Sequence, residues 1–187
     1  MTVTDPPSLR DRLRQGTAQA HAQVDALFGS ADFATRDGYV GFLVGQAVAW
    51  ETLRPILDRS SLARSDALRE DLLRLGSAVP RPVTATDLLD PMSLGHRYVL
   101  EGSRLGSILL GRLLAERSPD LAPQANAYLT ESAKIEPWKR LSATLQNLPG
   151  DHASAELAVA DAVAMFGLFE RAWHHGASLR TEANSID

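Results

Sequence analysis

The chain has 187 residues, 44% of them hydrophobic and 22% charged, which are ordinary values for one globular domain with a continuous core. It contains no cysteine, so disulfides, thiolate catalysis and thiolate-ligated metals are excluded. A net charge of −4 without a concentrated basic face argues against nucleic acid as a partner. No run of about 18 apolar residues and no signal-peptide pattern occurs, so we expect a cytoplasmic protein that does not enter a membrane.

Apolar residues recur at helical spacing almost throughout the sequence, whereas the alternating pattern of a β-strand is nearly absent. The predicted helices cover residues 8–28, 35–59, 65–75, 91–117, 122–133, 137–148 and 153–175. No internal repeat and no long linker divides the chain. We therefore expect one all-α domain over residues 1–187, with a core from about 8 to 178 and flexible ends.

Several helix boundaries are marked by specific residue types. Ser8 and Ser65 are predicted N-caps, because a serine hydroxyl can accept a free backbone N–H of the first turn. Gly29 and Gly76 are predicted helix stops. Pro55 is expected to bend the second helix or to end it early. Residues 77–90 contain two prolines and are predicted to form a loop with a short turn.

The first predicted helix has one apolar stripe with a histidine at its edge. The stripe consists of Leu13, Thr17, Ala20, Val24, Leu27 and Phe28. On a continuous helix, Asp25 lies one turn after His21, and Arg14 lies almost directly above His21, about 10 Å along the axis. An imidazole that ligates iron needs an acceptor for its second N–H, and a guanidinium at that distance can pair with a heme propionate. The same spacing also fits a histidine at the core boundary with two solvated charges beside it.

The helix predicted over 91–117 carries an unusual number of glycines. Each mid-helix glycine costs about 1 kcal/mol relative to alanine, so Gly95, Gly102 and Gly106 on one face call for a reason. A face without side chains lets the backbone approach a flat ligand, and Ser103 and Ser107 can bond local carbonyls or water. Close packing against a second helix explains the glycines equally well. Gly111 points to the other side and is expected to serve packing.

Four segments together resemble the heme oxygenase family, in the order that the family has them. The segments are Thr17-Ala-Gln-Ala-His21 with Val24-Asp25, Thr35-Arg-Asp-Gly-Tyr39, Tyr98 to Ser107, and Ala164-Met-Phe-Gly-Leu-Phe-Glu170. They are similar to the proximal-ligand segment, the start of the second helix, the distal helix and the final core helix. The glycine-bearing segment is most similar to the bacterial branch that is associated with bacteriophytochromes.

The resemblance implies an all-α fold that holds heme b between the first helix and the glycine-bearing helix. By position, His21 matches the iron ligand, and Asp25 matches the acidic residue beside it. The implied catalytic residues are Gly102, Ser103 and Gly106, with Ser103 and fixed water as hydrogen-bond donors on the distal side. The implied heme-contacting residues are His21, Arg14, Thr17, Asp25, Ser107, Lys139 and Arg140.

Two positions depart from the family pattern. Animal-type members have aspartate where this chain has Ser103, although bacterial relatives often lack it. Family members commonly have a second glycine at the position of Ser107, where a hydroxymethyl group bears on which ring edge is attacked.

The implied activity is the cleavage of heme to biliverdin, with release of iron and CO. It uses O₂ and electrons from a ferredoxin, a reductase or a small reductant, and its product is expected to supply a bacteriophytochrome. The alternatives are a non-catalytic heme carrier or store on the same fold, a relative that acts without heme, such as a thiamin-degrading enzyme, and a helical interaction module. His96 is the substitute candidate for the iron ligand. The basic residues scattered over 62–74 are expected to form a solvated helix face.

Overall fold

The computed structural model describes residues 7–84, 92–150 and 153–184. Its helices are α1 (Leu9–Gly16), α2 (Ala18–Gly29), α3 (Arg36–Leu53), the 3₁₀ turn η1 (Arg54–Ile56), α4 (Arg59–Arg74), α5 (Leu94–Arg117), α6 (Ala127–Ser132), α7 (Glu136–Gln146) and α8 (Ala153–Asn184). Within these described ranges, the only β pairing is an isolated bridge between Ser8 and Pro149. The all-α prediction is confirmed.

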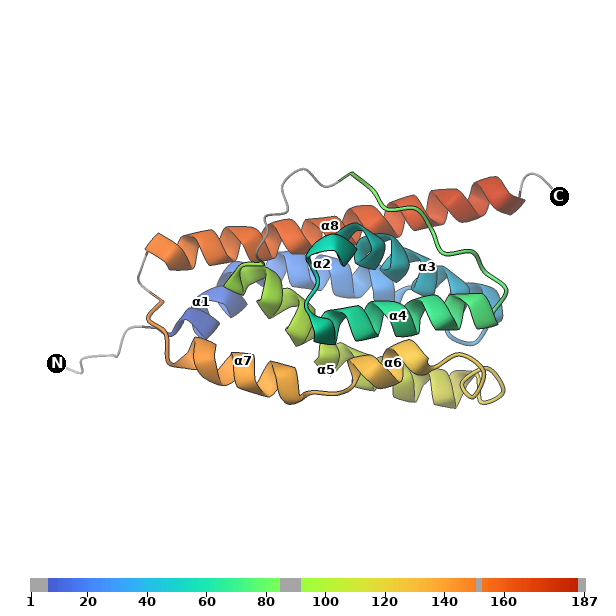
Figure 1. The fold of residues 1–187 in the computed structure, drawn as a ribbon, viewed down its shortest axis with the longest axis horizontal. Helices are drawn as coiled ribbons and strands as arrows, with labels where there is room; N and C mark the ends of the chain where they lie inside the picture. The colour runs from blue at the N-terminus through green and yellow to red at the C-terminus, as the bar shows by residue number, and fades with distance from the viewer. Residues whose placement is uncertain (1–6, 85–91, 151–152, 185–187) are drawn as a thin grey trace.

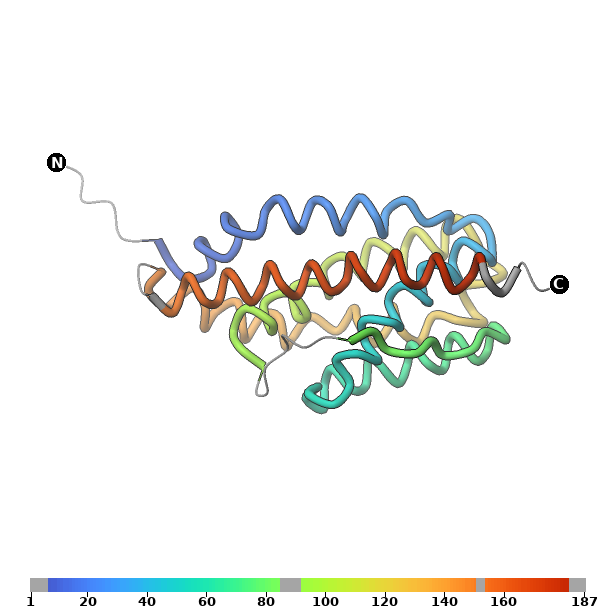
Figure 2. The backbone as a smooth tube through the Cα atoms, turned by 90° about the horizontal axis from the view of Figure 1, so that it is seen from above, coloured from blue at the N-terminus to red at the C-terminus, as the bar shows by residue number. Residues whose placement is uncertain are grey.

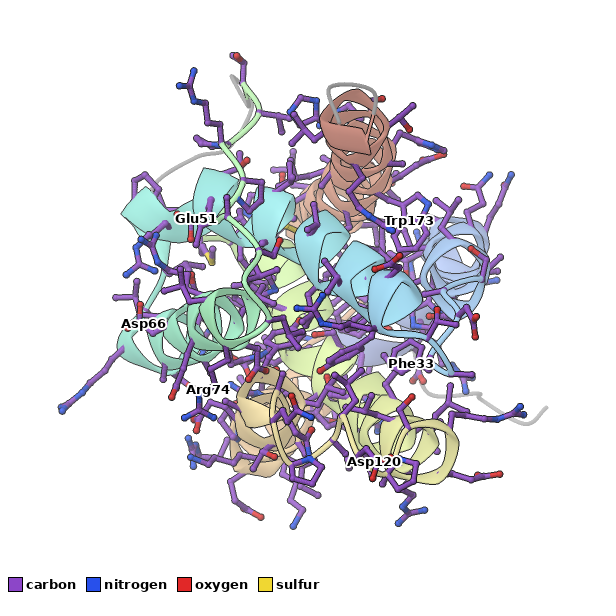
Figure 3. All side chains as sticks on the ribbon, turned by 90° about the vertical axis from the view of Figure 1, so that its right-hand side faces the viewer. Phe33, Glu51, Asp66, Arg74, Asp120 and Trp173 are labelled. Carbon is purple, nitrogen blue, oxygen red and sulfur yellow. The ribbon has the colours of Figure 1, made fainter. Side chains whose placement is uncertain are left out.

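The long helix α8 is the element against which the others are arranged. It runs along the length of the bundle, with α1 and α2 on one side and α4 on the other (Figure 2), and it packs most extensively on α3 and α5. Helices α5, α6 and α7 form the opposite layer (Figure 1). Seen along the bundle, Asp66, Arg74 and Asp120 lie at its outside, and Trp173 of α8 lies toward α2 (Figure 3). None of the helices in the described part of the chain combines the length and the apolar character needed to span a bilayer.

Helix ends follow the capping residues in most places. The hydroxyl groups of Ser8 and Thr35 accept the N–H groups of Asp11 and Gly38 at 3.2 and 3.1 Å, so both helices begin where we expected. After α4, Gly76 has a φ of +65°, and the N–H of Ser77 reaches back to the carbonyl of Leu72 at 2.9 Å. This geometry confirms the predicted stop, because glycine adopts a positive φ without strain.

The predicted start of α4 is wrong. The helix begins at Arg59, and the carboxylate of Asp58 caps it by accepting the Ser61 N–H at 2.8 Å. Ser65 lies inside the helix, is buried, and accepts a hydrogen bond from Arg54 at 2.9 Å. A residue caps a helix only where its own backbone is extended, and before α4 the residue with that conformation is Asp58.

The first helix is not continuous, which corrects a second prediction. Thr17 (φ −104°, ψ 0°) separates α1 from α2, and its buried hydroxyl donates to the carbonyl of Leu13 at 2.8 Å. Gly16, the last residue of α1, packs against α8, where an added Cβ would lie 2.5 Å from Val159. Because the axis changes at Thr17, the helical spacing that placed Arg14 directly above His21 no longer applies.

Other boundaries differ by shorter distances. As expected, Pro55 ends the helix early, since α3 stops at Leu53 and the proline lies in η1. Residues 122–126 form turns, so α6 is shorter than predicted, and α8 continues nine residues beyond the predicted end at 175. The predicted first-turn proline, Pro91, lies outside the described residues.

Arg64 of α4 is a charged residue in the core, although the basic residues of 62–74 were expected to form a solvated face. It is fully buried, and its guanidinium lies 4.6 Å from the centre of the Trp50 ring. It donates to the Leu100 carbonyl at 2.6 Å and to the hydroxyls of Ser103 and Ser132 at 2.8 and 2.9 Å. A single side chain of α4 therefore ties α5 to α6.

We expect Arg64→Met to lower the free energy of unfolding by about 2–3 kcal/mol, because the buried acceptors around the guanidinium lose their donor. Arg74→Met is the matched control on the same helix. Arg74 is exposed and bonds only Glu70 in the described structure, so its replacement should change stability by less than about 0.5 kcal/mol. Urea unfolding of both variants measures the difference. Equal losses of stability would contradict the role of Arg64 as a clamp that joins α4, α5 and α6.

His96 has a structural position at the start of α5. Its Nδ1 accepts the Ser93 N–H at 3.4 Å, while the Ser93 hydroxyl accepts the His96 N–H at 3.3 Å, which is a capping box. The side chain is buried, and burial lowers the pKa of His96 below its ordinary value. A protonated Nδ1 cannot accept the Ser93 N–H, so the cap requires the neutral ring.

This position makes part of the stability pH-dependent. The folded protein binds a proton at His96 less readily than the unfolded chain, so this contribution is present above about pH 6.5 and is lost as the pH falls. We expect His96→Gln, which keeps an acceptor at the third helical position but does not titrate, to lose less stability than wild type between pH 7.5 and 5.5. Urea unfolding at both pH values tests this, and a steeper loss in the variant would refute it.

Candidate active site

A cavity of about 410 Å³ lies between α2 and α5 and is closed by residues of α3, α6, α7 and α8. Most of its wall is apolar, with a few polar side chains, as in small-molecule sites. Of the predicted site residues, it is lined by His21, Asp25, Gly102, Ser103, Gly106 and Ser107. The two segments singled out in the sequence therefore form facing walls of one cavity.

His21 lies on the α2 wall and makes two contacts. Its Nδ1 lies 3.0 Å from a carboxylate oxygen of Asp25, one helical turn later. This contact favours the ring proton on Nδ1 and leaves the lone pair on Nε2, the form in which imidazole ligates a metal. The ring also packs edge-on against Phe166 of α8, with centroids 5.4 Å apart. Among the described residues, no group of three or more His, Asp or Glu side chains is arranged to hold a metal ion.

The glycines of α5 have two different roles. A Cβ at Gly95 would lie 2.0 Å from the carbonyl oxygen of Ala158, so this glycine allows α5 to cross α8 at backbone contact. A Cβ at Gly106 would meet no atom within 4 Å, and one at Gly102 would only touch Trp138 at 3.6 Å. Packing explains the first glycine, whereas Gly106 leaves open space on the cavity side. At Gly111 an added Cβ would lie 3.9 Å from the Leu129 side chain, so packing there does not require glycine.

The two serines of the α5 wall bond to their own helix. Ser103 donates to the Leu100 carbonyl at 2.8 Å and accepts from Arg64 at 2.8 Å. Ser107 donates to the Ser103 carbonyl at 3.2 Å. Both hydroxyl protons are thus directed at backbone carbonyls, and in this arrangement Ser103 has no free proton for the donor role that the resemblance implied.

One edge of the cavity carries aromatic groups near basic side chains. Tyr98 packs edge-on against Trp138, with ring centroids 5.7 Å apart. Burial raises the pKa of Tyr98, while a hydrogen bond with Thr17 and the charges of Arg10 and Arg14 act in the opposite direction. Thr17 therefore lies beside Tyr98, and neither Thr17 nor Arg14 lines the cavity.

Lys139 and Arg140 are also absent from the cavity wall. Lys139 is exposed on α7 and pairs with Glu136 at 2.7 Å, and Arg140 is exposed beside it. Their neighbour Trp138 is the α7 residue that reaches the cavity.

The cavity has a third wall, formed by α3 and α6, and it carries a polar group that the sequence did not reveal. The Tyr128 hydroxyl accepts the indole N–H of Trp50 at 3.1 Å and donates to the Gln46 side-chain carbonyl at 2.9 Å, and both Tyr128 and Gln46 line the cavity. These residues come from α3 and α6, so no local spacing connects them. Tyr98 was accessible to sequence reasoning, because it lies one turn before Gly102 on the same face of the helix.

Comparisons with known proteins point to one family. No protein-family model matches the sequence. The chain is 30% identical to heme oxygenase PigA of Pseudomonas aeruginosa, over 90% of this chain and 96% of that protein. It is 35% identical to the heme oxygenase of Xanthomonas campestris pv. campestris, over 57% of this chain and 64% of that one.

The fold agrees as well. The crystal structures of the NO- and CO-bound heme oxygenase of Neisseria meningitidis superpose with a TM-score of 0.57 over 90% of this chain and 92% of that one, at 23% identity. A shared fold and 30% identity to PigA along nearly the whole of both chains lead to one conclusion. The chain belongs to the heme oxygenase family.

Proposed function

We propose that the cavity between α2 and α5 binds heme as substrate and that the protein is a heme oxygenase, which cleaves the ring oxidatively to biliverdin. The observation that carries the proposal is that two different walls, one from α2 and one from α5, face each other across the cavity. An imidazole with a carboxylate on its Nδ1 stands on one side, and a helix face without a side chain at Gly106 stands on the other.

The residues of the cavity fit a porphyrin. Its volume of about 410 Å³ lies in the range of about 300–1,000 Å³ that is typical of small-molecule sites. Two large apolar side chains of the α5 wall, Leu105 and Leu109, are 47% and 64% exposed, and a flat apolar ligand would cover such a surface. The wall aromatics Phe166 and Trp138 add further flat apolar contact area.

When bound, heme supplies the iron that takes up O₂ and the ring that is oxidised, with electrons from an external donor. His21 would hold the iron through Nε2, and Asp25 would accept the hydrogen bond of the Nδ1 proton, which leaves the Nε2 lone pair for the metal. The chain has no cysteine, so a thiolate with its stronger electron donation is not available as a ligand.

On the opposite wall, this chain's backbone limits the space over the ligand. At Gly106 the backbone is open to the cavity, and Trp138 stands beside Gly102. The Ser103 and Tyr128 hydroxyl protons are already bonded within the protein. On the neighbouring α3 side, Gln46 keeps a side-chain NH₂, because its carbonyl oxygen is the group that accepts the Tyr128 hydroxyl proton. On the α5 wall itself, shape would therefore do more than hydrogen bonding to orient a small ligand.

Several finer parts of the proposal come from the sequence alone. They are the identity of the heme as heme b, the electron donor, the cytoplasmic location and the supply of a bacteriophytochrome. Arg14, Lys139 and Arg140 stay predicted propionate partners.

We expect His21→Ala to lose the ferric absorption spectrum of histidine-ligated heme when hemin is titrated into the protein, because no second group can replace the imidazole at this wall. His174→Ala is the control, since His174 is an exposed histidine of α8 that does not line the cavity. An unchanged spectrum in His21→Ala would eliminate this residue as the ligand.

We expect Gly106→Leu to remain folded, with stability equal to wild type or up to about 1 kcal/mol higher, because mid-helix glycine is unfavourable and the added group meets open space. Biliverdin formation should fall roughly tenfold or more, which corresponds to about 1.4 kcal/mol, and it should fall more than hemin affinity does. Gly29→Leu is the control, because its added group is also unobstructed but lies outside the cavity. Wild-type turnover in Gly106→Leu would refute the close approach of the backbone.

Turnover separates the enzyme from the heme carrier. Hemin-loaded wild type, given ascorbate and O₂, should develop the absorption of biliverdin and lose that of heme. Stable heme under these conditions, with binding intact, would favour a carrier.

A further inference from the structure

The orientation of the His21 ring depends on a contact that the sequence did not reveal. Asp25 is on the same helix, one turn away, whereas Phe166 reaches the ring from α8. The two contacts differ in strength and in the direction in which each restrains the imidazole.

The Asp25 contact is a weak restraint on the ring plane. Both side chains are largely exposed, at 57% for His21 and 67% for Asp25, so water and salt screen their attraction. A contact at Nδ1 can set the ring plane only as firmly as the exposed Asp25 side chain is itself held. The second side-chain torsion of histidine is intrinsically broad, so it adds little.

The Phe166 contact restrains the plane itself. Phe166 is only 6% exposed and lies within a long helix, so its own ring has little freedom. The two rings meet at 81° with centroids 5.4 Å apart, which is the favourable edge-to-face arrangement of aromatic pairs. Turning the imidazole about its axis would either drive an edge into the phenyl ring or break the contact.

We propose that Phe166 is a positioning residue that sets the plane of the His21 imidazole and, through it, the orientation of the iron ligand relative to the porphyrin nitrogens. The inference rests on the proposed role of His21 as ligand. The plane of an axial imidazole decides which iron orbitals receive its electron density, so a neighbour that fixes this plane tunes the metal.

The chain offers a matched control for this contact. Phe169 is on the same helix, is also 6% exposed, and also lines the cavity. Its ring contacts are with Phe28 and Trp50 instead of His21. Phe166→Leu and Phe169→Leu thus remove the same group from the same wall, and one of them removes the ring against His21.

The first experiment uses the ligand-free protein and does not depend on heme. In wild type, NMR should show a ring-current shift of the His21 ring protons and cross-relaxation with the Phe166 ring. We expect both signals to be lost in Phe166→Leu and kept in Phe169→Leu. Phe166→Met removes the ring with a flexible side chain if the leucine variant does not fold, and Phe166→Tyr should restore the signals because it keeps a ring.

The second experiment uses the hemin–cyanide complexes. The spread of the four heme methyl shifts in NMR reports the imidazole plane, and we expect a changed order or spread in Phe166→Leu, the wild-type pattern in Phe166→Tyr and a near-wild-type pattern in Phe169→Leu. Hemin release should become roughly 2- to 12-fold faster in Phe166→Leu, which corresponds to about 0.5–1.5 kcal/mol for one aromatic pair.

The outcomes separate this inference from the proposed function. Equal methyl patterns in Phe166→Leu and wild type, or equal changes in both leucine variants, would overturn the positioning role while hemin binding and turnover stand. A wild-type protein that binds no hemin would overturn the proposed function, and the ligand-free NMR result would still show whether Phe166 holds the His21 ring.

Discussion

The cavity depends on the crossing of α5 and α8, which are in backbone contact at Gly95 and move apart toward Gly106. At Gly95 the two backbones touch, since even a methyl group there would overlap the Ala158 carbonyl. Eleven residues later, about 16 Å along the helix, Gly106 has no neighbouring atom within 4 Å of where its Cβ would lie. Two helices that are in backbone contact at one point and cross at an angle must separate along their length, and the space between them widens accordingly. The glycine that closes the crossing and the glycine that opens onto the cavity are thus parts of one geometric arrangement, in which the first sets the position of the second.

Helix α8 also fixes the opposite wall, so both walls share one reference. Val159 of α8 packs against Gly16 just before the break at Thr17, and Phe166 lies against the His21 ring two turns further along α8. Near the other end of α8, Gly176 meets the backbone of Gly45 on α3. Because α2, α3 and α5 all pack on α8, a shift of one wall relative to α8 also changes its position relative to the other walls. This explains how a cavity between two helices keeps its width although few residues join those helices directly.

Sequence reasoning was accurate where one helix carries the signal and failed where several helices combine. The periodic apolar pattern and the cap at Ser8 are local, and the structure confirms the helices they predicted. The glycine face of α5 is local too, but its spacing alone did not separate Gly95, which packs, from Gly106, which opens onto the cavity. The break at Thr17 comes directly after Gly16, which packs against Val159 of α8, and the spacing of apolar residues in this segment did not show it. Arg64 looked like part of a solvated face, because its acceptors belong to helices far away in the sequence. The polar contacts of Tyr128 and Gln46 were out of reach for the same reason.

The polar groups of the two walls are organised in opposite ways. On the α2 wall, His21 and Asp25 are exposed and leave the imidazole lone pair free, so this wall presents a reactive group. On the α5 wall, Ser103 is held by the buried guanidinium of Arg64 and by the Leu100 carbonyl, and Ser107 is bonded to the same helix. A hydroxyl whose proton and lone pair are both engaged offers little to a ligand, and breaking those bonds would leave buried groups unsatisfied. The α5 wall therefore acts mainly through the position of its backbone, which the crossing with α8 and the clamp of Arg64 hold in place. A wall of this kind would direct a bound ligand by exclusion, and in the proposed function the bond to the ligand comes from the histidine on the other wall.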